Sequence, residues 1–266
     1  MDSLFLKNLT IEVQKLAQEA GTFIREEQKQ FKSHQVEIKG FNSLVSYVDK
    51  QTEQFLVEGL SKLLPEAGFI TEEETVENER KALSWVIDPL DGTTNFIHGL
   101  PIFSVSIGLL HQDDLLLGSV YESSQNESFY AWKNGGAFCN GEPIKVSESQ
   151  NINECLFATG FPYYDYGRME AFKLLLSDFF EGTRGLRRLG SAATDLAWVA
   201  CGRFDGFFEY GLSPWDVAGG SIIVTEAGGR VSDFRGKSDF IFGKTLISSN
   251  KKVYESFLKF IRNRMD

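Results

Sequence analysis

The sequence has few cysteines, few histidines and no long apolar run. Its three cysteines, Cys139, Cys155 and Cys201, lie far apart and form no Cys-x-x-Cys pair, which argues against a disulfide framework and against a zinc site. The three histidines are too scattered to suggest a ligand set or a catalytic triad. No run approaches the roughly 20 apolar residues that cross a bilayer. The start, M-D-S-L-F-L-K-N-L, lacks the features of a signal peptide, so we expect a cytoplasmic protein without a membrane segment.

Basic residues are also scarce relative to acidic ones. The chain has 27 Lys and Arg against 37 Asp and Glu, a formal net charge of −10. Because nucleic acids are bound by clustered basic side chains, we expect no nucleic-acid partner. Clustered acids can instead hold divalent cations. With 266 residues, 42% of them hydrophobic, the chain can bury a large core.

The hydrophobic pattern of the first half predicts helices followed by an antiparallel meander. Residues 49–64 form a second expected helix, with Phe55, Leu56 and Leu60 turned inward and Pro65 beyond its end. Residues 101–136 alternate apolar and small or polar side chains, with short polar linkers, as in an antiparallel sheet. The first expected helix, 4–30, has apolar residues on one face: Leu6, Leu9, Val13, Leu16, Ala17, Ala20 and Ile24.

The second half alternates strands and helices. Strands are expected at 155–159 and 205–210, and helices at 169–180, 191–201 and 217–227. Gly202 and the pair Gly228-Gly229 stand where helix ends favour a left-handed residue. We therefore predict an α+β half, 1–145, with an antiparallel sheet, and an α/β half, 146–266, with a mixed sheet that completes a shared cleft.

The stretch W-V-I-D-P-L-D-G-T-T-N-F, residues 85–96, ends an apolar run in two aspartates. Pro89 fixes one backbone angle between Asp88 and Asp91, and Gly92 permits a turn that other residues resist. Converging carboxylates repel each other unless a cation lies between them, and Mg²⁺ prefers such oxygen ligands. The following Gly-Thr-Thr supplies backbone N–H groups for an anion if Thr93 begins a helix. An ordinary turn, with the aspartates as helix caps, is the alternative interpretation.

Two further acidic segments have both a structural and a functional interpretation. The run Glu72-Glu73-Glu74 follows the strand-like Gly68-Phe69-Ile70, although such runs are usually solvated surface. In P-W-D-V-A-G-G, Asp216 stands at the start of an apolar helix, where an aspartate commonly serves as the N-cap.

Together these segments resemble the inositol monophosphatase family of Mg²⁺-dependent, lithium-sensitive phosphatases. The resemblance rests on the 85–96 motif, the Glu-Glu after a strand, W-D-V-A-G-G with T-E-A-G-G behind it, and L-V-S-Y-V-D near the start. The stretch R-R-L-G-S-A-A-T-D-L-A-W-V-A-C-G-R-F-D-G-F-F-E-Y-G-L is similar to bacterial members. The similarity extends from the first helix nearly to the C-terminus, and it implies a layered αβαβα fold.

The resemblance also implies a set of site residues. Asp49 and Thr93, with Glu72, would serve catalysis by positioning and activating a water. One Mg²⁺ would be held by Glu72, Asp88 and the Leu90 carbonyl, a second by Asp88, Asp91 and Asp216, and a third, looser ion would lie near Glu72. Substrate contacts would come from the metal-site residues Leu90, Asp91 and Asp216, the phosphate cradle Gly92, Thr93 and Thr94, and the alcohol-binding residues Gly190, Ser191, Ala192 and Glu209.

The implied activity is hydrolysis of a small polyol phosphate, with myo-inositol 1-phosphate as the family default, by a homodimer. The rivals in the superfamily are 3′(2′),5′-bisphosphate nucleotidase, fructose-1,6-bisphosphatase and histidinol phosphatase; a non-catalytic metal-binding scaffold is the alternative from another class. Thr94-Asn95 favours the monophosphatase branch, because the nucleotidases often carry a basic residue after the first Thr. Ser43 departs from the family's usual aspartate, and the loop between Glu72 and Asp88 is short.

Overall fold

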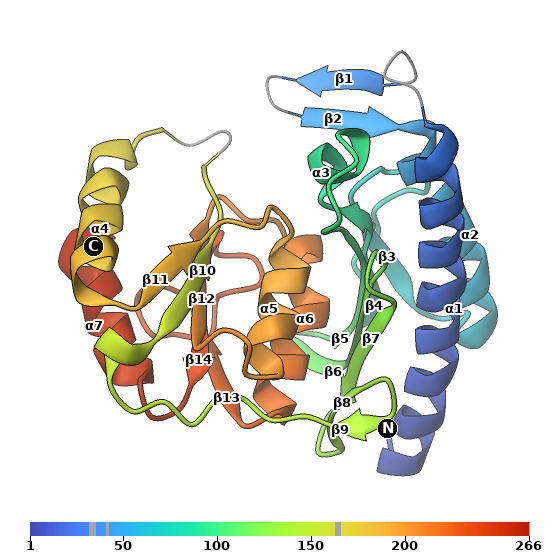
Figure 1. Ribbon diagram of the computed structural model, residues 1–266. Helices are drawn as coiled ribbons and strands as arrows, with labels where there is room; N and C mark the ends of the chain where they lie inside the picture. The colour runs from blue at the N-terminus through green and yellow to red at the C-terminus, as the bar shows by residue number, and fades with distance from the viewer. Residues whose placement is uncertain (32–35, 41–42, 163–165, 266) are drawn as a thin grey trace.

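The computed structural model describes residues 1–31, 36–40, 43–162 and 166–265, with residues 36–40 and 43–45 described by their backbone alone. Five layers succeed one another across the molecule in Figure 1. Helices α1 and α2 cover a seven-stranded sheet, α5 and α6 lie between that sheet and a five-stranded one, and α4 and α7 form the opposite outer layer. This is the αβαβα arrangement that the family resemblance implies.

The seven-stranded sheet has the order β3-β4-β5-β6-β7-β8-β9. Strands β5, β6 and β7 form the antiparallel meander predicted for residues 101–136. Strands β4, β8 and β9 extend it with further antiparallel pairs, whereas β3 runs parallel to β4 at one edge. The elements of this half are α1 (Ser3–Gln30), β1 (Val36–Gly40), β2 (Ser43–Ser46), α2 (Tyr47–Leu63), β3 (Gly68–Thr71), β4 (Leu83–Asp91), α3 (Thr93–Ile97), β5 (Ser104–His111), β6 (Asp114–Glu122), β7 (Glu127–Trp132), β8 (Gly136–Cys139) and β9 (Glu142–Pro143).

The five-stranded sheet has the order β11-β10-β12-β14-β13 and is mixed. Strands β11, β10 and β12 are parallel, and β14 pairs antiparallel with both β12 and β13. The elements of this half are η2 (Ile152–Glu154), β10 (Leu156–Thr159), α4 (Met169–Gly182), β11 (Gly185–Arg187), α5 (Ala192–Ala200), β12 (Gly206–Tyr210), α6 (Pro214–Glu226), β13 (Gly229–Ser232), β14 (Thr245–Asn250) and α7 (Tyr254–Met265).

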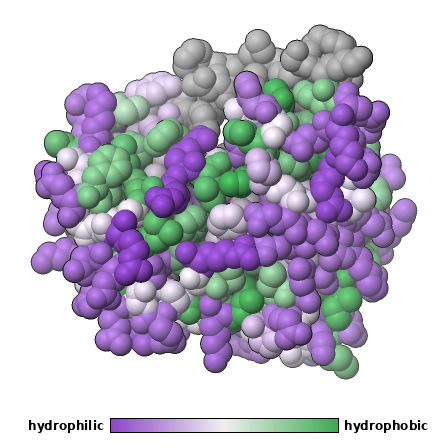
Figure 2. All heavy atoms as spheres, in the orientation of Figure 1, coloured by the Kyte–Doolittle hydropathy of each residue, from purple (hydrophilic) through white to green (hydrophobic). Residues whose placement is uncertain are grey.

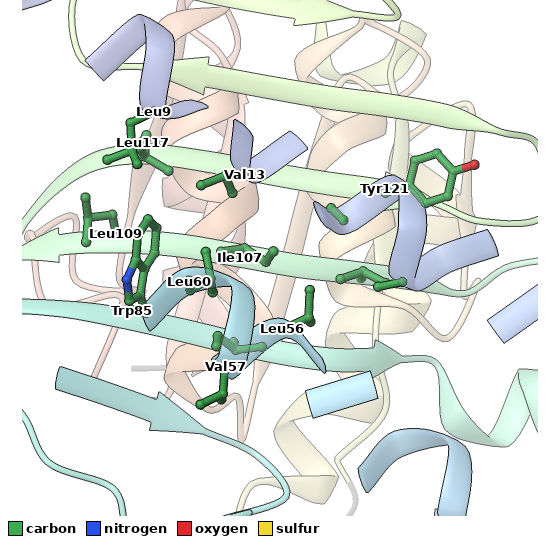
Figure 3. Close-up of a cluster of buried hydrophobic side chains, with 14 of the residues drawn as sticks. Leu9, Val13, Leu56, Val57, Leu60, Trp85, Ile107, Leu109, Leu117 and Tyr121 are labelled. Atoms are coloured by element: carbon green, nitrogen blue, oxygen red, sulfur yellow. The ribbon is translucent and has the colours of Figure 1, made fainter. Parts of the chain in front are cut away.

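Apolar side chains fill each interface between layers. Figure 3 shows one such cluster, where Leu9 and Val13 of α1 and Leu56 and Leu60 of α2 pack with Trp85 and other side chains of the seven-stranded sheet. The spacing of these residues along each helix puts them on one face, so burying that face removes a continuous apolar stripe from water. Sheet and helices thus form a packed platform whose strand ends and helix starts carry the acidic residues.

The predicted elements agree with the structure except in details. Phe55 was expected to point inward, but it is 40% exposed; Leu56 and Leu60 define the buried face of α2, and Phe55 precedes it by about 100° of helical turn. The helix predicted at 217–227 begins earlier, at Pro214. Gly202 and Gly228 have φ of +77° and +90°, as the helix-end pattern requires, whereas Gly229 belongs to strand β13. The division near residue 145 stays a prediction.

The surface is mostly polar. Figure 2 shows hydrophilic side chains over much of one face, with apolar side chains gathered mainly over the half that carries α4. Leu174 and Phe180 of α4 are among the most exposed large apolar residues. Among the described residues, none of the helices is both long enough and apolar enough to span a membrane.

Candidate active site

A β-bulge in β4 places Asp88 and Asp91 on the same side of the sheet. Asp88 pairs with Ser106 of β5 and Asp91 with Ser104, so two residues of β4 lie opposite one residue of β5. In a regular strand, residues three apart point to opposite faces. The extra residue restores a common direction, and Pro89 fits there because a bulge interrupts the ladder of hydrogen bonds.

Asp216 joins these two aspartates from the second half of the chain. Oxygen atoms of Asp88, Asp91 and Asp216 all lie within 4.8 Å of one another. Asp216 is the third residue of α6, and its Oδ2 accepts a hydrogen bond of 2.7 Å from the backbone N–H of Ser213. The helix cap is therefore Ser213, and Asp216 completes a capping box instead of being the cap itself.

The carboxyl groups of the cluster repel one another. Burial raises the pKa of Asp216 to about 7, and the charge of Asp91 contributes to the rise. The pKa of Asp91 rises to about 6 through burial, opposed by hydrogen bonds from Ser191 and Ala193. Burial, and then the charge of Glu72, raises the pKa of Asp88 well above its usual value.

Glu72 extends the acidic cluster from the end of β3. Burial raises the pKa of Glu72 well above its usual value, followed by the charges of Asp216 and Glu73. Glu74, by contrast, is exposed, so the acidic run is only partly surface. Asp88 is buried, whereas Glu72, Asp91 and Asp216 are half-buried. Together these carboxyl groups form a hard oxygen donor set that suits a divalent cation, because a cation would relieve their mutual repulsion.

The first turn of α2 brings Asp49 to the same place. Asp49 is almost completely buried, and its Oδ2 accepts hydrogen bonds from the backbone N–H and the hydroxyl of Ser46, at 2.8 and 2.6 Å. The Thr93 hydroxyl lies 3.0 Å from Asp49 Oδ1 and 3.1 Å from the Leu90 carbonyl oxygen. Burial raises the pKa of Asp49, and the hydrogen bonds from Ser46 and Thr93 oppose that rise.

The Gly-Thr-Thr segment begins a short helix, as expected. Gly92 precedes α3 with φ of +95° and ψ of 34°, a left-handed conformation that glycine adopts without strain. A Cβ on Gly92 would lie 3.1 Å from the Ile102 carbonyl oxygen and 3.2 Å from that of Gly190. The first N–H groups of a helix have no partner within the helix, and Thr94 beside them is exposed.

The start of α5 approaches Asp91 from the second half. Ser191, the N-cap of α5, donates its hydroxyl to Asp91 Oδ2 at 2.6 Å, and the Ala193 N–H donates to the same oxygen at 2.7 Å. Ala192 also contributes a backbone hydrogen bond that lowers the pKa of Asp91. Glu209 of β12 lies near enough for the charges of Asp216 and Asp91 to raise its pKa, after burial as the main cause. The structure thus brings Asp88, Asp91 and Asp216 together, while Glu72 does not belong to that group of three. Glu209 is linked to it by charge.

Three buried polar residues near this site were not predicted to be site residues. Asn95 donates its side-chain N–H groups to the carbonyl oxygens of Ile102 and Leu189, both at 2.8 Å, and so joins the two halves. Asp195 is buried in the first turn of α5, and burial followed by the Glu209 charge raises its pKa well above the usual value. Glu53 is fully buried one turn after Asp49. Its spacing of four residues from Asp49 is the signal that places both on one helix face.

The chain belongs to the inositol monophosphatase family, whose model matches residues 6–265. It is 40% identical over 248 residues to a putative Nus factor SuhB of Neisseria meningitidis serogroup A, covering 93% of this chain and 95% of that protein. It is 38% identical over 247 residues to an inositol-1-monophosphatase of Mesorhizobium japonicum, covering 92% and 93%. The crystal structure of the extragenic suppressor protein suhB of Bartonella henselae matches with a TM-score of 0.88 and 34% identity, over 96% and 98% of the chains.

Proposed function

We propose that the protein is a magnesium-dependent phosphomonoesterase that hydrolyses a small polyol phosphate, with myo-inositol 1-phosphate as the first candidate. The observation that carries this proposal is the meeting of Asp88, Asp91 and Asp216 within 4.8 Å, beside the hydrogen-bonded pair of Asp49 and Thr93. Membership of the inositol monophosphatase family supports the class of reaction.

Magnesium would be held by Glu72, Asp88, Asp91, Asp216 and the Leu90 carbonyl. When bound, such cations lower the pKa of water and neutralise charge on phosphoryl oxygens. Two to three ions per site are the expectation from the family.

In this proposal the chain's own groups hold the water and the phosphate. Asp49 Oδ1 and the Thr93 hydroxyl form a pair that orients a water and accepts its proton. The backbone N–H groups after Gly92 donate to phosphoryl oxygens, since the helix start leaves them without intrahelical partners. Water is therefore the nucleophile, and no side chain of the protein has to attack the phosphorus.

The alcohol part of the substrate would lie toward Gly190, Ser191, Ala192 and Glu209. Carboxylate and hydroxyl groups bind sugar-like hydroxyls through directional hydrogen bonds, and a substrate that lacks those hydroxyls leaves buried polar groups unpaired. A polyol fits this chemistry better than an apolar alcohol.

The test is phosphate release from four esters, with Mg²⁺ and with EDTA: inositol 1-phosphate, fructose 1,6-bisphosphate, histidinol phosphate and 3′-phosphoadenosine 5′-phosphate. Magnesium-dependent turnover with inositol 1-phosphate preferred is the expected result. Preference for another ester would correct the substrate, and no turnover on any of the four would overturn the proposal.

A second candidate role comes from the name of the Neisseria relative, a putative Nus factor. In that role the chain would act by binding a partner, and the acidic cluster would serve as a metal-binding scaffold. The candidates differ in one measurable respect, because only the phosphatase needs turnover. A protein that binds Mg²⁺ but hydrolyses none of the esters would favour the binding role.

A further inference from the structure

Glu53 is a completely buried carboxylate that holds the loop after β3. Its side chain is 0% exposed, and three donors of the loop point at it. Oε2 accepts from the backbone N–H of Glu73 at 2.8 Å, and Oε1 accepts from both the backbone N–H and the hydroxyl of Thr75, each at 2.8 Å. All three donors are neutral, so none of these three hydrogen bonds comes from a basic side chain.

The loop takes an unusual backbone conformation to make these contacts. Glu74, between the two donating residues, has φ of +51°, a left-handed conformation that costs free energy for a residue other than glycine. That conformation lets the N–H groups on either side of Glu74 turn toward one anion, as in other backbone anion nests. The loop geometry is thus fitted to the Glu53 carboxylate.

A second contact fixes the residue just before Glu72. The backbone N–H of Thr71 donates to Asn78 Oδ1 at 2.7 Å, and Asn78 Nδ2 donates back to the Thr71 carbonyl oxygen at 3.1 Å. Glu72 therefore lies between two anchored points, Thr71 on one side and Glu73 on the other. These anchors hold the backbone on both sides of Glu72, whose side chain also shares a hydrogen bond with Asp88.

Burying the Glu53 carboxylate is costly unless it is hydrogen-bonded. The three donors of the loop supply those hydrogen bonds. A glutamine would fit the same space, but its NH₂ group would face a donating N–H at either end, so one anchor would be lost. A carboxylate is the group that accepts from both ends of the loop.

We propose that Glu53 is a positioning residue that holds Glu72 at the cation site and thereby sets the affinity of the protein for the divalent cation. The proposal rests on the proposed function in that Glu72 is taken as a metal ligand. Residues that orient metal ligands typically change metal affinity by about 10- to 100-fold when they are replaced. Glu53 acts through the loop backbone, so we expect a change near the lower end of that range.

The chain offers a matched control. Glu122 is also 0% exposed, and it holds a turn in the same way. Its Oε2 accepts from the Gln125 N–H at 2.7 Å, and its Oε1 accepts from the Ser124 hydroxyl at 2.7 Å. The turn that Glu122 holds carries no proposed metal ligand. Glu53→Gln and Glu122→Gln therefore remove the same kind of buried anchor, one at the Glu72 loop and one away from it.

The experiment compares Mg²⁺ binding by the full-length wild type, Glu53→Gln and Glu122→Gln, using calorimetric titration with MgCl₂. Phosphate release is measured in parallel as a function of Mg²⁺ concentration. We expect both variants to melt at a lower temperature than the wild type. Only Glu53→Gln should need about tenfold more Mg²⁺ for half-saturation and for half-maximal activity, with turnover restored at saturating Mg²⁺. Equal Mg²⁺ affinity in the wild type and Glu53→Gln would overturn the proposal.

Thr75→Val provides a second test that keeps the Glu53 charge. It removes only the hydroxyl donor, so we expect a smaller loss of Mg²⁺ affinity in the same direction. If Glu53→Gln does not fold, Thr75→Val decides, since an unchanged affinity there contradicts the proposed anchor. Calorimetry needs no substrate. Absence of turnover in a wild type that binds Mg²⁺ would therefore overturn the proposed activity while leaving the comparison of affinities intact.

Discussion

Replacing Asp49 by asparagine separates the structural role of this side chain from its catalytic role. Asp49 Oδ2 accepts two hydrogen bonds from Ser46, and Oδ1 accepts one from Thr93. An asparagine with its carbonyl oxygen at the Oδ2 position keeps both Ser46 bonds. Its NH₂ group would then face Thr93, whose hydroxyl can donate to the Leu90 carbonyl 3.1 Å away. The fold therefore tolerates the change, whereas the proton acceptor at Oδ1 is lost.

Asp49→Asn should affect the stability of the fold much less than the rate of hydrolysis. Losing the hydrogen bond from Thr93 to residue 49 should lower the free energy of unfolding by about 1 kcal/mol. This loss is partly offset because a neutral amide is cheaper to bury than the carboxylate. For a chain of this size that lowers the melting temperature by about 2–4 °C. Loss of a general base costs about 10²- to 10⁴-fold in rate, or about 3–5 kcal/mol of activation free energy.

Phosphate release at saturating Mg²⁺ and thermal melting measure the two effects on the same sample. Ser46→Ala is the matched control: it removes the N-cap hydroxyl, at a cost of about 0.5–2 kcal/mol, but it leaves the Asp49 carboxylate in place. We expect Ser46→Ala to keep most of its activity. Asp49→Asn with a rate within tenfold of the wild type would refute the assignment of Asp49 as the proton acceptor.

Three further outcomes are expected. Asp216→Asn should keep the Ser213 hydrogen bond and the fold but weaken Mg²⁺ binding, as titration with MgCl₂ would measure. The loss should be at least the roughly 10- to 100-fold that replacing a residue behind the ligands typically causes, because Asp216 is itself a proposed ligand. The metal-free protein should lose stability as the pH rises from about 4 to about 7, because the pKa values of Asp91 and Asp216 are raised from an ordinary 3.8 to about 6 and about 7 in the folded state. Their raised pKa values mean that the folded state binds more protons than the unfolded state in that range; melting curves with and without saturating Mg²⁺ check this, since bound cation should flatten the slope. Asn95→Ala should raise KM by a larger factor than it lowers Mg²⁺ affinity, because it removes the hydrogen bond that holds the Leu189 carbonyl, next to the proposed alcohol-binding residue Gly190.

The sequence predicted the layers and the residues of the site better than it predicted how they meet. Asp88 and Asp91 were expected to converge because of Pro89 and Gly92, but the bulge that puts them on one face depends on the pairing with β5. For Glu53, the sequence indicated the helix face but not the contacts. Its helical spacing from Asp49 was visible in the sequence, but its partners lie 20 and 22 residues away in a loop whose shape follows from tertiary packing.

The structural and functional interpretations of the acidic residues turn out to be compatible. Asp49 and Asp216 each complete a capping box, Asp91 accepts from the start of α5, and Asp88 accepts from the backbone N–H of Leu90 at 2.9 Å. In each case one carboxylate oxygen is fixed by the backbone, and a carboxylate has a second oxygen to offer a ligand. Backbone donors thus orient the carboxylates before a cation binds. This reduces the conformational entropy that the side chains lose on binding. This arrangement also explains why Asp→Asn variants are suitable tests: the amide oxygen can keep the anchor while the charge is removed.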